Sequence, residues 1–148
     1  MCEVFCCCRP RCCICCSRVA IAASLGDTGR PEAAAVAAGV AAGAKGVTDY
    51  GKAEIGDKTL VDALLPLTET LTARIAAGDD FLDAWQVAAA SATTAAEATA
   101  DLLPRMGRAR THGMNSVGTP DPGAISLALI ATSVGALLAD RIERKAHA

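Results

Sequence analysis

Asp121, Pro122 and Gly123 form a short motif at the start of an apolar segment that has helical periodicity. The first backbone N–H groups of a helix have no partner within it, and the helix dipole is positive there. A phosphate or another anion can bind at such an end. Pro122 would fix the entry angle of the chain, and Gly123 would let a ligand approach the backbone. The residues alone leave a second interpretation open, in which Asp121 is an ordinary helix N-cap within a turn.

A second group of reactive side chains lies at the N-terminus, where residues 1–19 contain all eight cysteines. Two C-x-x-C pairs have metal-ligand spacing, but they overlap and no further pair follows at a distance. Palmitoylation of cysteines beside arginines is another interpretation. A signal peptide fits less well, because arginines interrupt its apolar core. We favour a Cys-rich, unstructured leader that is foreign to the domain at residues 20–148, since the two stretches differ in composition.

The composition indicates an all-α protein with one main domain. Hydrophobic residues make up 52% of the 148 residues but aromatic residues only 3%. The apolar content is therefore mostly alanine, the best helix former, with leucine and valine. The formal net charge is −2 without a clustered basic stretch, so we expect no nucleic-acid partner. Residues 20–148 contain no cysteine, which is typical of a cytoplasmic protein.

Hydrophobic periodicity and helix stop signals divide the domain into elements. We expect the end of a helix running into a turn at residues 20–30, and helices at residues 31–49, 59–77, 81–106 and 122–145. Thr99 would bond back to the carbonyl of Ala95 within its helix. The last helix contains an uncharged stretch that is short for a membrane span, so we expect a buried core helix and no membrane partner. Residues 107–123 form the longest irregular stretch, which points to function or disorder.

Two extended motifs flank the helix predicted at residues 81–106. The first runs from Gly51 to Pro66 and reads GKAEIGDKTLVDALLP. The second begins with Gly107-Arg108-Ala109 and continues to Ala124 through SVGTPDPGA. Together they resemble the GDKT/GDRT-x-x-DAL-x-P and GRA…S-x-G…DPGA motifs of the DhaL-type domains of dihydroxyacetone kinases. The resemblance covers roughly residues 20–144 and rests on both motifs in order.

The resemblance implies an antiparallel α-helical barrel that binds ADP or ATP together with Mg²⁺ at one end. It also implies ATP-dependent phosphorylation of a short-chain ketose such as dihydroxyacetone. The ketose-binding kinase domain would be a partner, either fused to this domain or present as a separate subunit. An alternative is a non-catalytic nucleotide-binding or interaction module.

The resemblance assigns roles to individual residues of this chain. Arg108 would bind phosphate oxygens with a fixed positive charge. Leu60 would lie against the adenine face, and the motif Asp121-Pro122-Gly123 would hold the nucleotide. Asp57 has two equal interpretations, as a ligand or as a cap of the helix at Thr59. We expect His112 to be a loop residue near solvent without a catalytic role, because the histidine that binds substrate in this family belongs to the other domain.

One family element is absent from the sequence. Similar domains hold Mg²⁺ with the aspartates of an early G-D-x-D-x-G segment, and residues 26–29 offer only one carboxylate. We therefore expect no metal ligands and no catalytic residues in this chain. We also expect an incomplete barrel made of its later helices, with apolar faces left exposed. Since Mg²⁺ neutralises much of the charge in phosphoryl transfer, the isolated chain should have little or no kinase activity.

Overall fold

The computed structural model describes residues 20–27, 29 and 31–146, apart from the side chains of residues 108, 109, 145 and 146. The predictions for residues 1–19 lie outside the described residues. The main helices are α2 (Ala33–Gly51), α3 (Val61–Ala76), α4 (Phe81–Ala98) and α5 (Pro122–Ala146). Two 3-10 helices, η1 (Thr99–Asp101) and η2 (Arg108–Ser116), lie between α4 and α5. No β-strand occurs in the described part, which confirms the all-α prediction.

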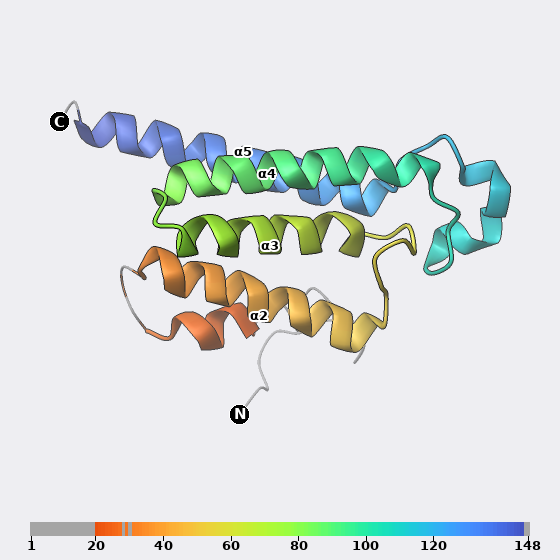
Figure 1. Ribbon diagram of the computed structural model, residues 1–148, viewed down its shortest axis with the longest axis horizontal. Helices are drawn as coiled ribbons and strands as arrows, with labels where there is room; N and C mark the ends of the chain where they lie inside the picture. The colour runs from red at the N-terminus through yellow and green to blue at the C-terminus, as the bar shows by residue number, and fades with distance from the viewer. Residues whose placement is uncertain (1–19, 28, 30, 147–148) are drawn as a thin grey trace.

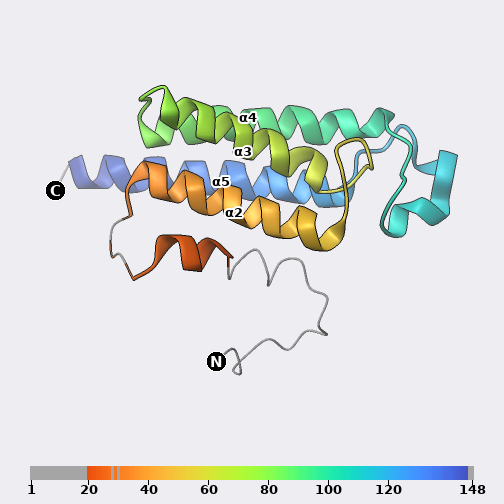
Figure 2. The same ribbon diagram turned by 60° about the horizontal axis from the view of Figure 1, so that its bottom comes forward.

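The four long helices form an antiparallel bundle in which each helix runs opposite to the one before it (Figure 1). Turning the molecule shows α2 and α5 on one side of α3 and α4 (Figure 2). The loop between α2 and α3 and the long connection between α4 and α5 lie at the same end of the bundle. That end therefore gathers the two sequence motifs.

The bundle core consists mainly of alanine. Its larger buried members, Leu67 and Leu71, come from α3. The buried alanines from four helices are Ala37, Ala63, Ala84, Ala88, Ala89, Ala92, Ala96, Ala124, Ala128 and Ala131. Such small side chains let helix axes approach closely, so that backbone and large side chains from neighbouring helices come into contact.

The contact between α4 and α5 shows this close approach. The indole Nε1 of Trp85 donates a hydrogen bond of 2.8 Å to the carbonyl of Ala131. A Cβ atom on Gly135 would lie 3.1 Å from Cδ1 of the same indole. The glycine therefore leaves the space in which the tryptophan ring reaches the backbone of α5.

The helix that starts at Phe81 is shorter than predicted, because it ends at Ala98 and not near residue 106. The hydroxyl of Thr99 donates to the carbonyl of Ala96, not to that of Ala95 as expected. The same hydroxyl accepts a 2.7 Å bond from the backbone N–H of Asp121. Thr99 thus ties the end of α4 to the start of α5. Residues 107–123, which were expected to be irregular, contain η2, a 3-10 segment that is kinked at Gly113.

Helix α5 has the predicted extent, but it is not the buried core helix that we expected. Leu129, Ile130 and Leu137 are 63%, 61% and 66% exposed. Within Pro122–Arg144, an 18-residue window has a mean hydropathy of 1.8, and 22% of that window is buried. By length and composition this one helix of the described residues could cross a membrane. Its other face packs in the bundle through Ala124, Ala128 and Ala131.

The remaining boundaries agree closely with the sequence analysis. Residues 20–25 are helical and end at Gly26, which has a φ of 57°. Their side chains Ile21 and Leu25 lie over Gly39 of α2.

The exposed outer face of α5 agrees with the expectation of exposed apolar surface on the later helices.

Candidate functional site

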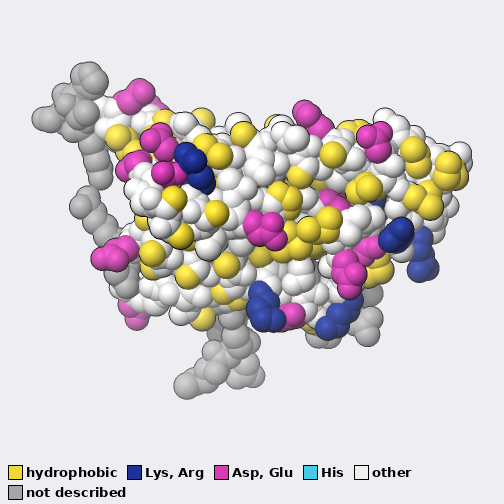
Figure 3. Space-filling view, viewed as in Figure 1, with side chains coloured by type: hydrophobic (Ala, Val, Ile, Leu, Met, Phe, Trp, Pro, Cys, Tyr) yellow, Lys and Arg dark blue, Asp and Glu magenta, His cyan; other side chains and the backbone are white. Residues whose placement is uncertain are grey.

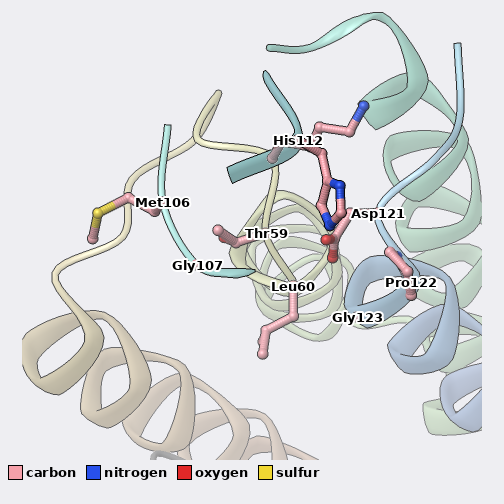
Figure 4. Close-up of a pocket in the computed structure, with 9 residues that line it drawn as sticks. Thr59, Leu60, Met106, Gly107, His112, Asp121, Pro122 and Gly123 are labelled. Carbon is pink, nitrogen blue, oxygen red and sulfur yellow. The ribbon is translucent and has the colours of Figure 1, made fainter. Parts of the chain in front are cut away.

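A cavity of about 510 Å³ opens at the end of the bundle where the two motifs meet. This volume lies within the usual range of small-ligand sites. Its walls come from the loop before α3, the connection after α4 and the first turn of α5. The lining residues are Lys58, Thr59, Leu60, Met106, Gly107, His112, Asp121, Pro122 and Gly123 (Figure 4).

Four of the five predicted binding residues line this cavity: Leu60, Asp121, Pro122 and Gly123. They come from positions about sixty residues apart in the chain. The side chain of the fifth, Arg108, lies outside the described residues. Its backbone begins η2 directly after Gly107, which does line the cavity. The fold therefore brings the two motifs together at one site.

Asp121 caps helix α5. Its carboxylate accepts a 2.8 Å hydrogen bond from the N–H of Ala124, and its carbonyl accepts one of 3.0 Å from Ile125. Pro122 has no N–H, and the N–H of Ala124 is bonded to Asp121. Among the first three residues of α5, at most the N–H of Gly123 is therefore left for a ligand. The capping interpretation of Asp121 is therefore correct, and its carboxylate still borders the cavity.

Gly123 has a structural role that the sequence analysis did not include. A Cβ atom at this position would lie 2.9 Å from Oδ2 of Asp121 and 3.4 Å from Cβ of Leu60. Glycine thus permits the capping carboxylate and the residue before α3 to approach the start of α5. The close approach is made by the protein's own groups, whether or not a ligand is also present.

The loop before α3 is organised by Asp62, a residue without a predicted role. Its buried carboxylate accepts hydrogen bonds from the N–H groups of Gly56 and Thr59. One of the two interpretations of Asp57 was that it caps α3, and this interpretation is wrong. Its carboxylate accepts a 2.9 Å bond from the N–H of Glu54 and closes a turn of the loop. The ligand interpretation of Asp57 is left as a prediction.

Lys58 is the other residue that the sequence analysis missed. It is only 2% exposed, and its ammonium group donates to the backbone carbonyls of Ala100, Leu102 and Ser116. Nothing in the spacing of the GDKT motif indicates these partners, because they lie 42 to 58 residues further along the chain.

His112 borders the cavity, although it is exposed to solvent as predicted. A second cavity of about 280 Å³ adjoins the first and shares Lys58, His112, Asp121 and Pro122 with it. Its other lining residues are mostly polar and include Asn115, Ser116 and Thr119. The two cavities together offer an apolar part near Leu60 and Met106 and a polar part along the end of η2.

The residues of this region do not fit a magnesium site. Mg²⁺ prefers carboxylate oxygens, often with substrate phosphates and water as further ligands. Within the described part of the chain, no three histidine, cysteine, aspartate or glutamate side chains lie close enough together to hold a metal ion. Three acidic side chains at this end, Asp57, Asp62 and Asp121, already accept hydrogen bonds from backbone N–H groups.

Charged side chains of both signs are interspersed on the face shown in Figure 3. In α2, Lys45 donates a 2.6 Å hydrogen bond to Asp49. This bond lowers the pKa of the Asp49 carboxyl below its usual range. Both side chains are exposed, so the pair contributes little to stability.

Comparison with known proteins gives matches over most of the chain. Residues 19–136 match the model of the DAK2 domain. The chain is 52% identical over 115 residues to a D-erythrulose kinase of Mycolicibacterium smegmatis and 50% identical over 119 residues to an L-erythrulose kinase of Pectobacterium atrosepticum. These matches cover 78% and 80% of this chain but 20% of each relative. The ADP-binding subunit DhaL of the PEP-dependent dihydroxyacetone kinase of Escherichia coli is 40% identical over 85 residues, which are 57% of this chain and 40% of that subunit.

Proposed function

Since this chain belongs to the DAK2 domain family of dihydroxyacetone-kinase-like proteins, we propose that its cavity binds the ADP or ATP of a ketose kinase. The observation that carries the proposal is the meeting of Leu60, Gly107 and Asp121-Pro122-Gly123 around one cavity of about 510 Å³. The apolar part near Leu60 suits an adenine ring. The start of α5 and the guanidinium of Arg108 would provide positive charge for the phosphates.

We also propose the role of this chain in the larger reaction. The matched stretch is about a fifth of the length of the two erythrulose kinases, so a ketose-binding kinase domain or subunit would supply the rest of the active site. The substrate would be a short-chain ketose, phosphorylated at the expense of ATP. We place this activity in the cytoplasm.

The first test is calorimetric titration of ADP into the full chain, with Mg²⁺ and with a chelator. We expect measurable affinity, weakened about tenfold or more by Arg108→Ala, because a charge-assisted hydrogen bond to phosphate would be lost. Arg110→Ala is the matched control, since Arg110 is an exposed arginine of the same 3-10 helix. It should leave the affinity unchanged.

The outcome separates the proposal from its alternatives. An absence of ADP binding by the natural chain would refute the proposed nucleotide site. Equal losses with Arg108→Ala and Arg110→Ala would mean that general positive charge, and not the motif, attracts the nucleotide. We expect similar affinities with and without Mg²⁺, since the described residues offer no carboxylate cluster for the metal.

A non-catalytic nucleotide-binding module is the second candidate function, and the same lack of a carboxylate cluster favours it for the isolated chain. Phosphoryl transfer depends mostly on positioning and on charge neutralisation, to which a bound metal contributes. We therefore expect no ATP-dependent turnover of dihydroxyacetone by the chain alone. Mg²⁺-dependent product at ordinary enzyme rates would contradict this.

A further inference from the structure

Lys58 is a lysine withdrawn from solvent inside a loop. Its side chain belongs to a type that is almost never fully buried without partners. The ammonium Nζ lies 2.7 Å from the carbonyl oxygen of Ser116, 3.1 Å from that of Leu102 and 3.4 Å from that of Ala100. An ammonium group has three N–H donors, so these three carbonyls use its full donor capacity.

The three carbonyls lie on both sides of the segment that contains Gly107 and Arg108. Ala100 and Leu102 are at the end of η1, and Ser116 is the last residue of η2. Two backbone bonds support the same arrangement. The N–H of Gly118 donates to the carbonyl of Ala100 at 2.8 Å, and the N–H of Arg105 donates to that of Asp57 at 3.1 Å. Through these bonds, the loop before α3 holds the two ends of the connection between α4 and α5 close together.

We infer that Lys58 is a positioning residue, which fixes the segment carrying Gly107 and Arg108 relative to the first turn of α5, with the cavity between them. It does so through the carbonyls of residues 100, 102 and 116 and not by contact with a ligand, because no N–H donor is left for a phosphate oxygen. The structural part of this inference stands by itself. Its effect on nucleotide affinity rests on the proposed function.

The physical reason for such an effect is conformational entropy. Without the three hydrogen bonds of Lys58, the connection between α4 and α5 would sample many backbone conformations, and a ligand would have to order it on binding. With these bonds, the groups that face the cavity are held in place before a ligand binds. Loss of the ammonium would also leave three partly buried carbonyls without their shared partner.

Lys58→Met removes the ammonium and keeps an unbranched side chain of similar length. Lys58→Arg keeps a positive charge with several donors, and the GDRT form of the motif has arginine at this position. The matched control is Lys52→Met. Lys52 lies in the same loop and is exposed, and its φ of 56° is close to the 60° of Lys58. The two methionine variants therefore share the backbone cost and differ in the carbonyl contacts.

Two measurements test the inference, amide hydrogen exchange across the chain and calorimetric titration of ADP. With Lys58→Met we expect exchange at residues 100–118 to accelerate about tenfold or more, while the amides of α3 and α4 keep their protection. The affinity for ADP should fall about tenfold or more. Lys58→Arg and Lys52→Met should resemble the natural chain in both measurements.

Unchanged exchange at residues 100–118 in Lys58→Met would overturn the inference. So would an equal loss of protection throughout α3 and α4, because Lys58 would then stabilise the whole fold and not one segment. If the natural chain binds no ADP, the proposed function fails, and hydrogen exchange alone decides the role of Lys58.

Discussion

The loop before α3 depends on one buried carboxylate. Asp62 is 5% exposed, and its oxygens accept from two backbone N–H groups of the preceding loop, with Thr59 at 2.7 Å. Backbone donors that lose such an acceptor in a partly buried place are costly. Asp62 also lies in the first turn of α3, where a negative charge interacts well with the helix dipole.

Replacing Asp62 with alanine should lower the free energy of unfolding by about 1–3 kcal/mol, since two N–H groups lose their acceptor. Asp83→Ala is the control, because Asp83 is an exposed aspartate in the first turn of α4 and shares only the dipole contribution. That control should cost about 0.3–1 kcal/mol. Urea denaturation followed by circular dichroism measures both. Equal losses would show that the loop bonds add nothing.

Individual residues of the candidate site could be predicted only where a motif marks them. Leu60, Asp121, Pro122 and Gly123 stood out in this way, and all four line the cavity. Lys58 could not be assigned a role, because its partners are backbone carbonyls that carry no sequence signal. The capping bond of Asp121 could be predicted from general rules. The close approach of Leu60 to Gly123 could not, because this approach depends on how α3 and α5 pack together.

At the scale of helices, α4 and α5 are joined by small residues and one large ring. A helical glycine usually weakens a helix relative to alanine. Here Gly135 makes room for Trp85, whose indole is held by its bond to Ala131. The ring therefore cannot move away without losing a hydrogen bond.

Gly135→Val should lower the free energy of unfolding by about 1–3 kcal/mol, because the added methyl groups collide with Trp85. The neighbouring Ala136→Val is the control. Ala136 is exposed on the same helix, so this change should cost only the difference in helix propensity, about half a kcal/mol. Thermal unfolding of both variants gives the comparison. A Gly135→Val variant as stable as its control would mean that the helices separate easily.

The extent of most helices followed from periodicity and stop signals, and two features did not. The end of α4 was placed about eight residues too late, since no proline or glycine precedes Pro104 in that stretch. The actual end is set by Thr99, which bonds to both Ala96 and Asp121. The burial of α5 was also predicted to be greater than it is. An uncharged sequence does not indicate which faces of its helix pack against other helices.

At the scale of the whole molecule, the bundle has few large side chains inside and several outside. Leu71 and Val61 are the largest apolar side chains that are fully buried. Leu129, Ile130 and Leu137 lie on the outer face of α5 and are mostly exposed. Stability should therefore depend strongly on a few leucines of α3 and little on those of α5.

The same substitution at two sites tests this distribution. Leu71→Ala should cost about 2–5 kcal/mol, because it removes buried contacts and leaves a cavity. Leu137→Ala should change the free energy of unfolding by no more than about 0.5 kcal/mol, as expected for an exposed position. Denaturant unfolding of the full chain measures both. A large loss with Leu137→Ala would show that the outer face of α5 is covered in the protein.

Trp85 is the only tryptophan of the chain, and this gives the molecule an intrinsic optical probe. The indole lies in the first turns of α4, thirteen residues before Ala98, or about 20 Å from the end of the helix that leads to the cavity. Its fluorescence therefore reports separation of α4 from α5 without a label. An emission change on adding ADP would mean that occupation of one end of the bundle is transmitted to the other.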